Sequence, residues 1–331
     1  MKTSAISREL MLIGGSWKEA SSKEYLPVEN PAMKGSVIAE VPRANADDVD
    51  LAVKAAMEAF PTWREVPPRE RGKLLWKIAD KLEENLEDLA RTIATETGNA
   101  LRTQARGEAK GAIEVLRYFG GVASELKGET MPLENNTFAY TQREPYGVIG
   151  GIIPWNAPVQ LATLKIAPAI AAGNTIVLKA AEDAPLGVLK LAKVCAEILP
   201  PGVVNILTGY GEECGQPLAR HRHVRKLTFT GSTETGKIIM HEAADRIIPV
   251  SLELGGKSPQ IVYPDADSEK VIDNVIAAMR FARQGQSCSA GSRLYLHESI
   301  FDSFIDKLIK KLELLKVGDP LDEETDMGCI I

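Results

Sequence analysis

A regular alternation of strand-like and helix-like segments from Val148 to Leu254 constrains the fold more than any other feature of this sequence. The strand-like segments are short apolar runs, and the segments between them place apolar residues at helical spacing. We expect strands at 148–153, 175–178, 203–207, 226–229 and 250–254, and helices at 159–172, at 186–198 and after Ser232. Repeated strand–helix–strand units of this kind predict an α/β fold, in which helices cover both faces of a parallel sheet.

Ligands of such sheets bind beyond the carboxyl ends of the strands, so the residues that follow each expected strand are the candidate functional residues. The first strand is followed by a loop that two prolines stiffen, Pro154-Trp155-Asn156-Ala157-Pro158. The side-chain amide of Asn156 is suited to hydrogen bonding with a developing oxyanion. An Asx turn or a helix cap before Pro158 is an equally good interpretation of the same residue.

The next two strands end in residues that suit nucleotide binding. Lys179 and Glu182 place a cation and a carboxylate three residues apart, able to hold the two hydroxyls of a ribose, although a surface ion pair at a helix start is an alternative. The turn 209–215 reads GxGxxxG. This turn is a weak signal by itself, because it is one residue longer than the dinucleotide fingerprint.

The loop Gly231-Ser232-Thr233-Glu234-Thr235-Gly236-Lys237 opens a helix, where backbone amides attract phosphate. It nearly matches the ATP-binding P-loop, but Ile238 stands where Ser or Thr would bind magnesium. We therefore expect a nucleotide phosphate without ATP chemistry. The last strand alternates so that Glu253 lies on its polar face before Gly255 and Gly256, either as a general base or as a solvated glutamate.

One cysteine lies among small residues in the stretch Arg283-Gln284-Gly285-Gln286-Ser287-Cys288-Ser289. A thiolate attacks carbonyl carbon well, and it is favoured near a cation or a cluster of backbone amides, which Arg283, Arg293 and the glycines could supply. Taken alone, Cys288 is better interpreted as a small, buried, inert thiol, since most cysteines are structural. The motifs at the strand ends reverse that preference and make Cys288 the candidate nucleophile.

Composition excludes several classes of function. The chain has 39 Lys plus Arg against 45 Asp plus Glu, a net charge of −6, which provides no basic surface for nucleic acid or an anionic membrane. Its four cysteines are scattered and form no metal-type pairing with histidine, so we expect no metal and a reducing, cytoplasmic location. We also expect no membrane span, since the apolar segments are short or interrupted by Pro and Gly.

The residues before Val148 carry no chemical motif. Residues 11–42 read as short strands, and three amphipathic helices follow: one from Ala46 to Phe60, a long one after Pro68 that Gly98 ends, and one over 103–126. Residues 128–146 alternate as in a β-hairpin. Such a hairpin suits an interface arm and a plain surface hairpin equally well.

Together and in this order, the motifs resemble those of the NAD(P)-dependent aldehyde dehydrogenase superfamily. The similarity runs from about Leu12 to the last residue, and it is greatest to the branch that includes the betaine-aldehyde and the fatty or aromatic aldehyde enzymes. It rests on the Pro-Trp-Asn loop, the Lys179 to Glu182 pair, the Gly231 to Lys237 loop, Leu252-Glu253-Leu254-Gly255-Gly256-Lys257 and Gly285-Gln286-Ser287-Cys288. The resemblance implies oxidation of an aldehyde to a carboxylic acid, with NAD as the hydride acceptor.

The resemblance also implies a role for each residue. Cys288 would attack the aldehyde, Asn156 and the Cys288 backbone amide would hold the oxyanion, and Glu253 would activate the water that hydrolyses the thioester. NAD is favoured over NADP, because the Glu182 carboxylate would repel a 2′-phosphate. The implied cofactor contacts are Ile152, Pro154, Trp155, Lys179, Glu182, Gly211, Gly215, Phe229, Gly231, Ser232, Gly236 and Leu254.

For the fold, the resemblance implies a Rossmann-like NAD-binding domain made of residues 1–126 and 147–255. Residues 127–146 would be an oligomerisation arm, in a homodimer or homotetramer, and residues 256–331 the start of a second α/β domain, the catalytic domain. Family members continue beyond this point. We therefore expect a C-terminally truncated member, without a Glu-x-Phe-Gly-Pro-like segment and much of the substrate tunnel.

Three other functions are possible for a chain with these motifs. A cysteine hydrolase needs a histidine base, yet the four histidines lie near no partner motif. A CoA-acylating relative would not need Glu253. A non-catalytic protein of the same fold, which binds a nucleotide or serves in assembly, is the main alternative.

Overall fold

The computed structural model describes residues 6–331, and its centre is a seven-stranded sheet in the order β12-β11-β8-β9-β10-β2-β3. Five of the strands run parallel: β8 (Val148–Ile152), β9 (Thr175–Lys179), β10 (Val204–Leu207), β11 (Val224–Gly231) and β12 (Val250–Leu254). They lie where the apolar runs predict them. The α/β fold with a parallel sheet is confirmed.

The pairing partners of the N-terminal strands cannot be predicted from their sequence. β2 (Met11–Ile13) pairs antiparallel with β10, through Leu12 opposite Ile206, and β3 (Ser16–Lys18) forms the sheet edge. β4 (Tyr25–Glu29) and β5 (Val37–Pro42) form a separate small sheet with β1 (Ser7–Arg8). Of the first five strands, β2 and β3 therefore extend the main sheet, whereas β1, β4 and β5 form a sheet of their own.

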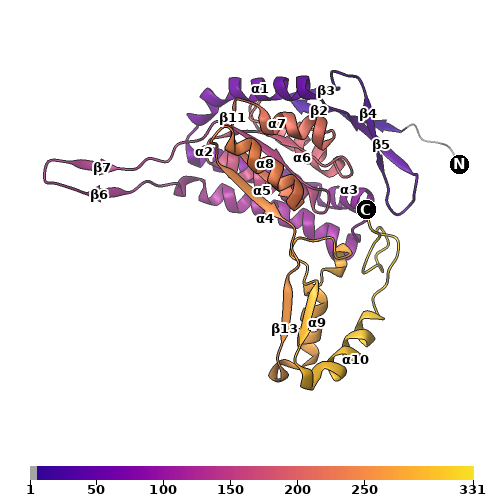
Figure 1. The fold of residues 1–331 in the computed structure, drawn as a ribbon. Coiled ribbons are helices and arrows are strands. Elements are labelled where there is room, and N and C mark those ends of the chain that lie inside the picture. The colour runs from indigo at the N-terminus through magenta and orange to yellow at the C-terminus, as the bar shows by residue number, and fades with distance from the viewer. Residues whose placement is uncertain (1–5) are drawn as a thin grey trace.

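Helices cover both faces of the sheet (Figure 1). One face carries α1 (Ala46–Arg64), α7 (Gln216–Arg220) and α8 (Thr233–Ala244), and the other carries α5 (Pro158–Ala171) and α6 (Leu186–Ile198). A further layer, formed by α2 (Pro68–Glu84), α3 (Leu86–Thr97) and α4 (Arg106–Val122), packs outside α5 and α6. Such layering explains why β8, β9 and β10 are apolar on both sides.

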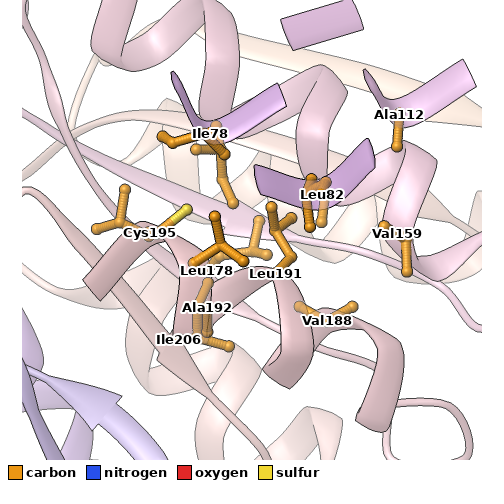
Figure 2. Packing of buried hydrophobic residues seen from close by; sticks show 14 of the residues in the cluster. Ile78, Leu82, Ala112, Val159, Leu178, Val188, Leu191, Ala192, Cys195 and Ile206 are labelled. Carbon is orange, nitrogen blue, oxygen red and sulfur yellow. The ribbon is translucent and has the colours of Figure 1, made fainter. Parts of the chain in front are cut away.

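The larger core lies between the sheet and the α2–α6 layers. Figure 2 shows Leu178 and Ile206 of the sheet packed with Leu191 of α6 and Ile78 of α2. A buried carboxylate belongs to this core: Glu96 of α3 accepts hydrogen bonds from the backbone N–H groups of Leu186 (2.6 Å) and Gly187 (2.9 Å). It thereby satisfies amides at the N-terminus of α6 that would otherwise be buried without partners.

All three N-terminal helices differ from their predicted bounds, the first only in that α1 continues past Phe60 to Arg64. The helix expected from Pro68 to Gly98 is two helices, because the chain leaves the helical conformation at Asn85 (φ −116°, ψ 23°). Gly98 does end α3, in the left-handed conformation (φ 72°). The helix predicted over 103–126 begins instead with a π-helical turn, η1 (Leu101–Ala105), and α4 ends at Val122.

The predicted hairpin is present: β6 (Thr130–Pro132) pairs antiparallel with β7 (Phe138–Tyr140) and extends away from the body of the protein (Figure 1). The residues after β12 form a second unit. In it the strands β13 (Pro259–Val262) and β14 (Arg293–Leu296) pair in parallel beside α9 (Glu269–Ala278) and α10 (Phe301–Leu312). This unit has its own apolar cluster around Ile272 and Phe304.

Within residues 6–331, no helix is long and apolar enough to span a lipid bilayer.

The core packing generates a stability prediction. Leu178→Ala removes a fully buried side chain from β9 and should lower the free energy of unfolding by about 2–5 kcal/mol. Leu51→Ala removes the same atoms from an α1 position that is 45% exposed, and should change that free energy by less than about 0.5 kcal/mol. Urea unfolding followed by circular dichroism measures both. Equal losses in the two variants would contradict the burial described here.

Candidate active site

The candidate site lies where the strand order of the sheet reverses. β8 has β9 on one side and β11 on the other, so the chain crosses in opposite directions after β8 and after β10. The loops that follow β8 and β11 therefore diverge at the carboxyl ends of these strands, the place where ligands of doubly wound sheets bind. Asn156 lies in the first of these loops and Ser232 in the second.

Cys288 lies in the cysteine loop, defined here as residues 280–291, which begins just after α9. A short 3-10 turn, η5 (Phe281–Arg283), is flanked by Arg280 (φ 61°) and Gln284 (φ 54°), both left-handed. Side-chain amides brace the loop: Gln284 Nε2 donates to the Gly98 carbonyl oxygen (3.1 Å), and Gln286 Nε2 donates to Gln284 Oε1 (2.9 Å). The Cys288 side chain is exposed.

Asn156 reaches the cysteine loop directly. Its Nδ2 donates a hydrogen bond to the Gln286 carbonyl oxygen at 2.9 Å, two residues before Cys288. Its Oδ1 is buried and has no partner within the described residues. The side chain neither caps α5 nor makes an Asx turn, so neither alternative interpretation of Asn156 holds.

Glu253 lies on the strand next to this loop. In β12, Val250, Leu252 and Leu254 pack partly buried against the core, while Ser251 and Glu253 are exposed, which confirms the predicted alternation. The glycines that follow bring the strand end against the cysteine loop, since a methyl group at Gly256 would lie 3.5 Å from the Cys288 carbonyl oxygen.

Lys165 is a residue that the sequence reasoning missed. It is buried in α5, and its Nζ donates to Thr228 Oγ1 (3.1 Å) and Thr230 Oγ1 (2.9 Å) on β11. Burial lowers the pKa of Lys165 to about 8. Glu253 of β12 pairs with Thr230 of β11, and its carboxylate opposes this lowering of the Lys165 pKa. The signal in the sequence is that Lys165 is the one charged residue of helix α5.

Several predicted cofactor residues gather at the ends of β8 and β9. Lys179 Nζ lies 2.6 Å from Glu182 Oε2, and because the lysine side chain is only 4% exposed, this is not the surface ion pair of the alternative interpretation. Gly215 lies against Ile152 and Lys179, where a methyl group would be 3.6 Å from Ile152 Cδ1. Glu182 and Gly211 line one hollow together with Arg43 and Tyr210.

The loop after β11 packs closely against neighbouring side chains. Ser232 is the N-cap of α8, and its Oγ accepts from the Thr235 backbone N–H at 3.1 Å. Gly231 lies on the Phe229 ring and Gly236 on Leu254, with no room for a methyl group at either glycine. Pro154 and Trp155 are partly buried in the loop before Asn156. All twelve predicted cofactor residues thus lie at or beside the carboxyl edge of the sheet.

The other cysteines have different surroundings. Cys195 and Cys214 are buried, and desolvation raises the pKa of each thiol to about 12, which keeps them protonated and unreactive near neutral pH. Cys329 is half-buried beside Gly98. Among residues 6–331, no group of His, Cys, Asp and Glu is arranged to hold a metal ion.

The bond between Asn156 and the cysteine loop can be tested by hydrogen exchange. Asn156→Ala removes one hydrogen bond, which is worth about 0.5–1.5 kcal/mol, so amide exchange over residues 284–291 should accelerate by about 2- to 10-fold. Asn136→Ala, at the exposed hairpin tip, is the matched control. Peptide-level exchange followed by mass spectrometry makes the measurement, and unchanged protection in Asn156→Ala would show that the bond does not hold the loop.

Comparisons with known proteins show which family the chain belongs to. A model of the aldehyde dehydrogenase family matches residues 17–331. Betaine aldehyde dehydrogenase 1 of Oryza sativa subsp. japonica is 45% identical over 99% of this chain and 66% of its own length, and an aldehyde dehydrogenase of Vibrio cholerae is 41% identical over 96% and 63%.

A crystal structure of PnpE, a protein of Pseudomonas sp. WBC-3, in complex with nicotinamide adenine dinucleotide is 41% identical and has a TM-score of 0.95. The match covers 97% of this chain and 66% of that one. The chain spans just under two thirds of the length of the curated relatives it matches. From the family match and these identities, we conclude that the chain belongs to the aldehyde dehydrogenase family.

Proposed function

We propose that this chain oxidises an aldehyde to a carboxylic acid with NAD as hydride acceptor, through a covalent intermediate on Cys288. The observation that carries the proposal is the hydrogen bond from Asn156 to the carbonyl of Gln286. It brings an amide donor from the mouth of the parallel sheet beside an exposed thiol, at the edge that also carries the Lys179–Glu182 pair. The names of the relatives support the same class of reaction.

In the first step the Cys288 thiolate attacks the aldehyde carbon, and the carbonyl oxygen becomes the oxyanion of a thiohemiacetal. An amide NH2 group has two donor hydrogens. One N–H of Asn156 is used by the Gln286 carbonyl, so the other remains for the oxyanion, together with the Cys288 backbone N–H. Donors already fixed in place stabilise such a charge without further reorganisation.

The arrangement of the strand ends fits NAD. Lys179 and Glu182 offer a donor and an acceptor for ribose hydroxyls, Gly211 and Gly215 give access for the adenine, and the amides at the start of α8 with Ser232 suit the pyrophosphate. NAD when bound supplies the acceptor for the hydride that leaves the thiohemiacetal carbon. The Glu182 carboxylate would repel a 2′-phosphate, which favours NAD over NADP.

In the last step Glu253 takes a proton from a water molecule, which attacks the thioester carbon. The carbon–sulfur bond breaks, the carboxylic acid leaves, and the proton held by Glu253 passes to the Cys288 thiolate, which restores both groups. Exposure of Glu253 on β12 gives water access to its carboxylate, as a general base requires.

The remaining assignments follow from the same proposal. The partner is a small aldehyde, and the β6–β7 hairpin serves as an oligomerisation arm in a homodimer or homotetramer. Its exposed Phe138 and Tyr140 suit that role. Residues 1–126 with 147–255 bind NAD, and residues 256–331 contribute to catalysis. Four cysteines that form no disulfide suit a cytoplasmic location.

A second candidate function is dinucleotide binding without turnover. It is favoured by the exposure of both Cys288 and Glu253 to solvent, because catalytic groups act best when water is excluded and their geometry is held.

The proposed function predicts cysteine-dependent NADH formation. The chain, mixed with NAD and a panel of aliphatic, aromatic and amino aldehydes, should give absorbance at the NADH wavelength, and Cys288→Ser should abolish it. Cys329→Ser, which changes another accessible thiol, is the control. Binding of NAD by calorimetry without any turnover would instead establish the second candidate function.

The role of Glu253 predicts a trapped intermediate. In Glu253→Gln the thioester forms but its hydrolysis slows by about 10²-fold or more, the usual contribution of a general base. Intact-mass analysis after addition of aldehyde and NAD should show Cys288 carrying an acyl group. Glu197→Gln, an exposed change on α6, should show none. A free thiol throughout in Glu253→Gln would remove Glu253 from the deacylation step.

A further inference from the structure

Arg43, which has no part in the mechanism above, lies beside the turn that follows β10. Two hydrogen bonds hold its chain neighbours there: Thr208 Oγ1 donates to the Pro42 carbonyl oxygen (2.6 Å), and the Ala44 backbone N–H donates to the Thr208 carbonyl oxygen (3.1 Å). A methyl group at Gly209 would lie 3.0 Å from the Ala44 carbonyl oxygen, so the two backbones are in close contact. The segment between β5 and α1 therefore packs against the edge of the sheet where the predicted cofactor residues gather.

The Arg43 guanidinium is held by several groups at once. Its Nε and Nη2 donate to the two carboxylate oxygens of Glu213, at 2.7 Å and 2.5 Å, and its Nη1 lies 3.1 Å from Glu24 Oε2. It also stacks over the Tyr210 ring, with 5.3 Å between Cζ and the ring centroid. Ion pairs near the surface are usually weak, but a bidentate pair between arginine and a carboxylate has a defined geometry. Glu213 therefore fixes the orientation of the guanidinium.

Arg43 and Glu213 line the hollow that also contains Glu182, a proposed ribose contact. The residues around this hollow are Arg43, Glu182, Tyr210, Gly211, Glu212 and Glu213, and of these described residues Arg43 is the one with a positive charge. Lys179, the nearest other cation, is already engaged, since its side chain is 4% exposed and its Nζ lies 2.6 Å from Glu182 Oε2. A phosphate on the 2′ oxygen of a ribose held by Glu182 would enter this hollow. Arginine is the side chain best suited to bind it.

We infer that Arg43 determines whether a nucleotide with a 2′-phosphate binds in this hollow, and that Glu213 withholds the Arg43 guanidinium from such a phosphate. The inference deepens the proposed function, on which it rests for the place of the adenosine ribose at Glu182. It gives the preference for NAD a second cause. Repulsion by Glu182 acts on a 2′-phosphate in any case, whereas the pairing of Arg43 with Glu213 occupies the cation that would offset this repulsion.

The test measures the binding of NAD and NADP by calorimetry without aldehyde, so no turnover is needed. Glu213→Ala removes both acceptors and frees Arg43, so the Kd for NADP should fall by about 10-fold, as expected for one charge-assisted hydrogen bond, and the Kd for NAD should change by less than about 2-fold. Glu212→Ala is the matched control. Glu212 lines the same hollow, but the ion pairs of Arg43 within residues 6–331 are to Glu24 and Glu213. Its loss should lower the Kd for NADP by about 2-fold at most.

Arg43 enters through a double-variant cycle. In the Arg43→Gln background, Glu213→Ala should lower the Kd for NADP by no more than about 2-fold, because the cation that it frees is gone. Arg43→Gln alone should change this Kd by less than about 2-fold, since Glu213 already occupies the guanidinium. Adenosine 2′-monophosphate and adenosine 5′-monophosphate locate the effect: Glu213→Ala should strengthen binding of the first and leave that of the second unchanged.

Circular dichroism and the urea midpoint establish that each variant is folded. Glu213→Gln, which keeps the size of the side chain and removes its charge, takes the place of Glu213→Ala if that variant unfolds, with an expected gain in NADP affinity of about 3-fold. An equal gain in Glu212→Ala, a gain that persists without Arg43, or an unchanged Kd for NADP would overturn the inference while NAD still binds. NAD binding without NADH formation would contradict the proposed turnover alone, and absence of all nucleotide binding would overturn both.

Discussion

Close packing around β8 is the constraint on which the rest of the structure depends. A methyl group at Gly150 would lie 3.0 Å from Leu227 and Val224, and one at Gly151 would lie 2.7 Å from Leu178. Side chains of the neighbouring strands thus fill the space above and below the central strand. Gly150 and Gly151 have no side chains, so the side chains of the neighbouring strands approach the backbone of β8 closely. Because β9 and β11 flank β8, the loops that follow β8 and β11 run in opposite directions.

That geometry brings together groups from distant parts of the chain. The Asn156 loop follows β8, whereas Cys288 belongs to the second unit, 132 positions later. They meet through few contacts: Asn156 with the Gln286 carbonyl, Arg283 with Gln160, and Gln284 with the Gly98 carbonyl. Each is worth about 1 kcal/mol. The site is therefore held by a small set of polar links across two separately packed cores.

Much of the fold and the site could be predicted from the sequence, because local patterns determine them. The five parallel strands are short apolar runs, and the motif residues follow strands whose carboxyl ends must share one edge. The pairing of β2 with β10 could not be predicted, since it is a contact across nearly two hundred residues with no local signal. The break at Asn85 could not be predicted, because apolar residues continue at helical spacing from the residues before Asn85 to those after it.

The segment after α10 has a consequence for the order in which the protein folds. It returns to the turn η1, where the Leu101 backbone N–H donates to the Pro320 carbonyl oxygen (2.7 Å) and Thr103 Oγ1 to the Asp326 carbonyl oxygen (2.7 Å). These contacts join positions more than two hundred residues apart, so they form only after the costly closure of a long loop. During synthesis the π-helical turn emerges from the ribosome long before its cover does. The surface of residues 98–106 is therefore left uncovered on the nascent chain until the segment that carries Pro320 and Asp326 has been synthesised.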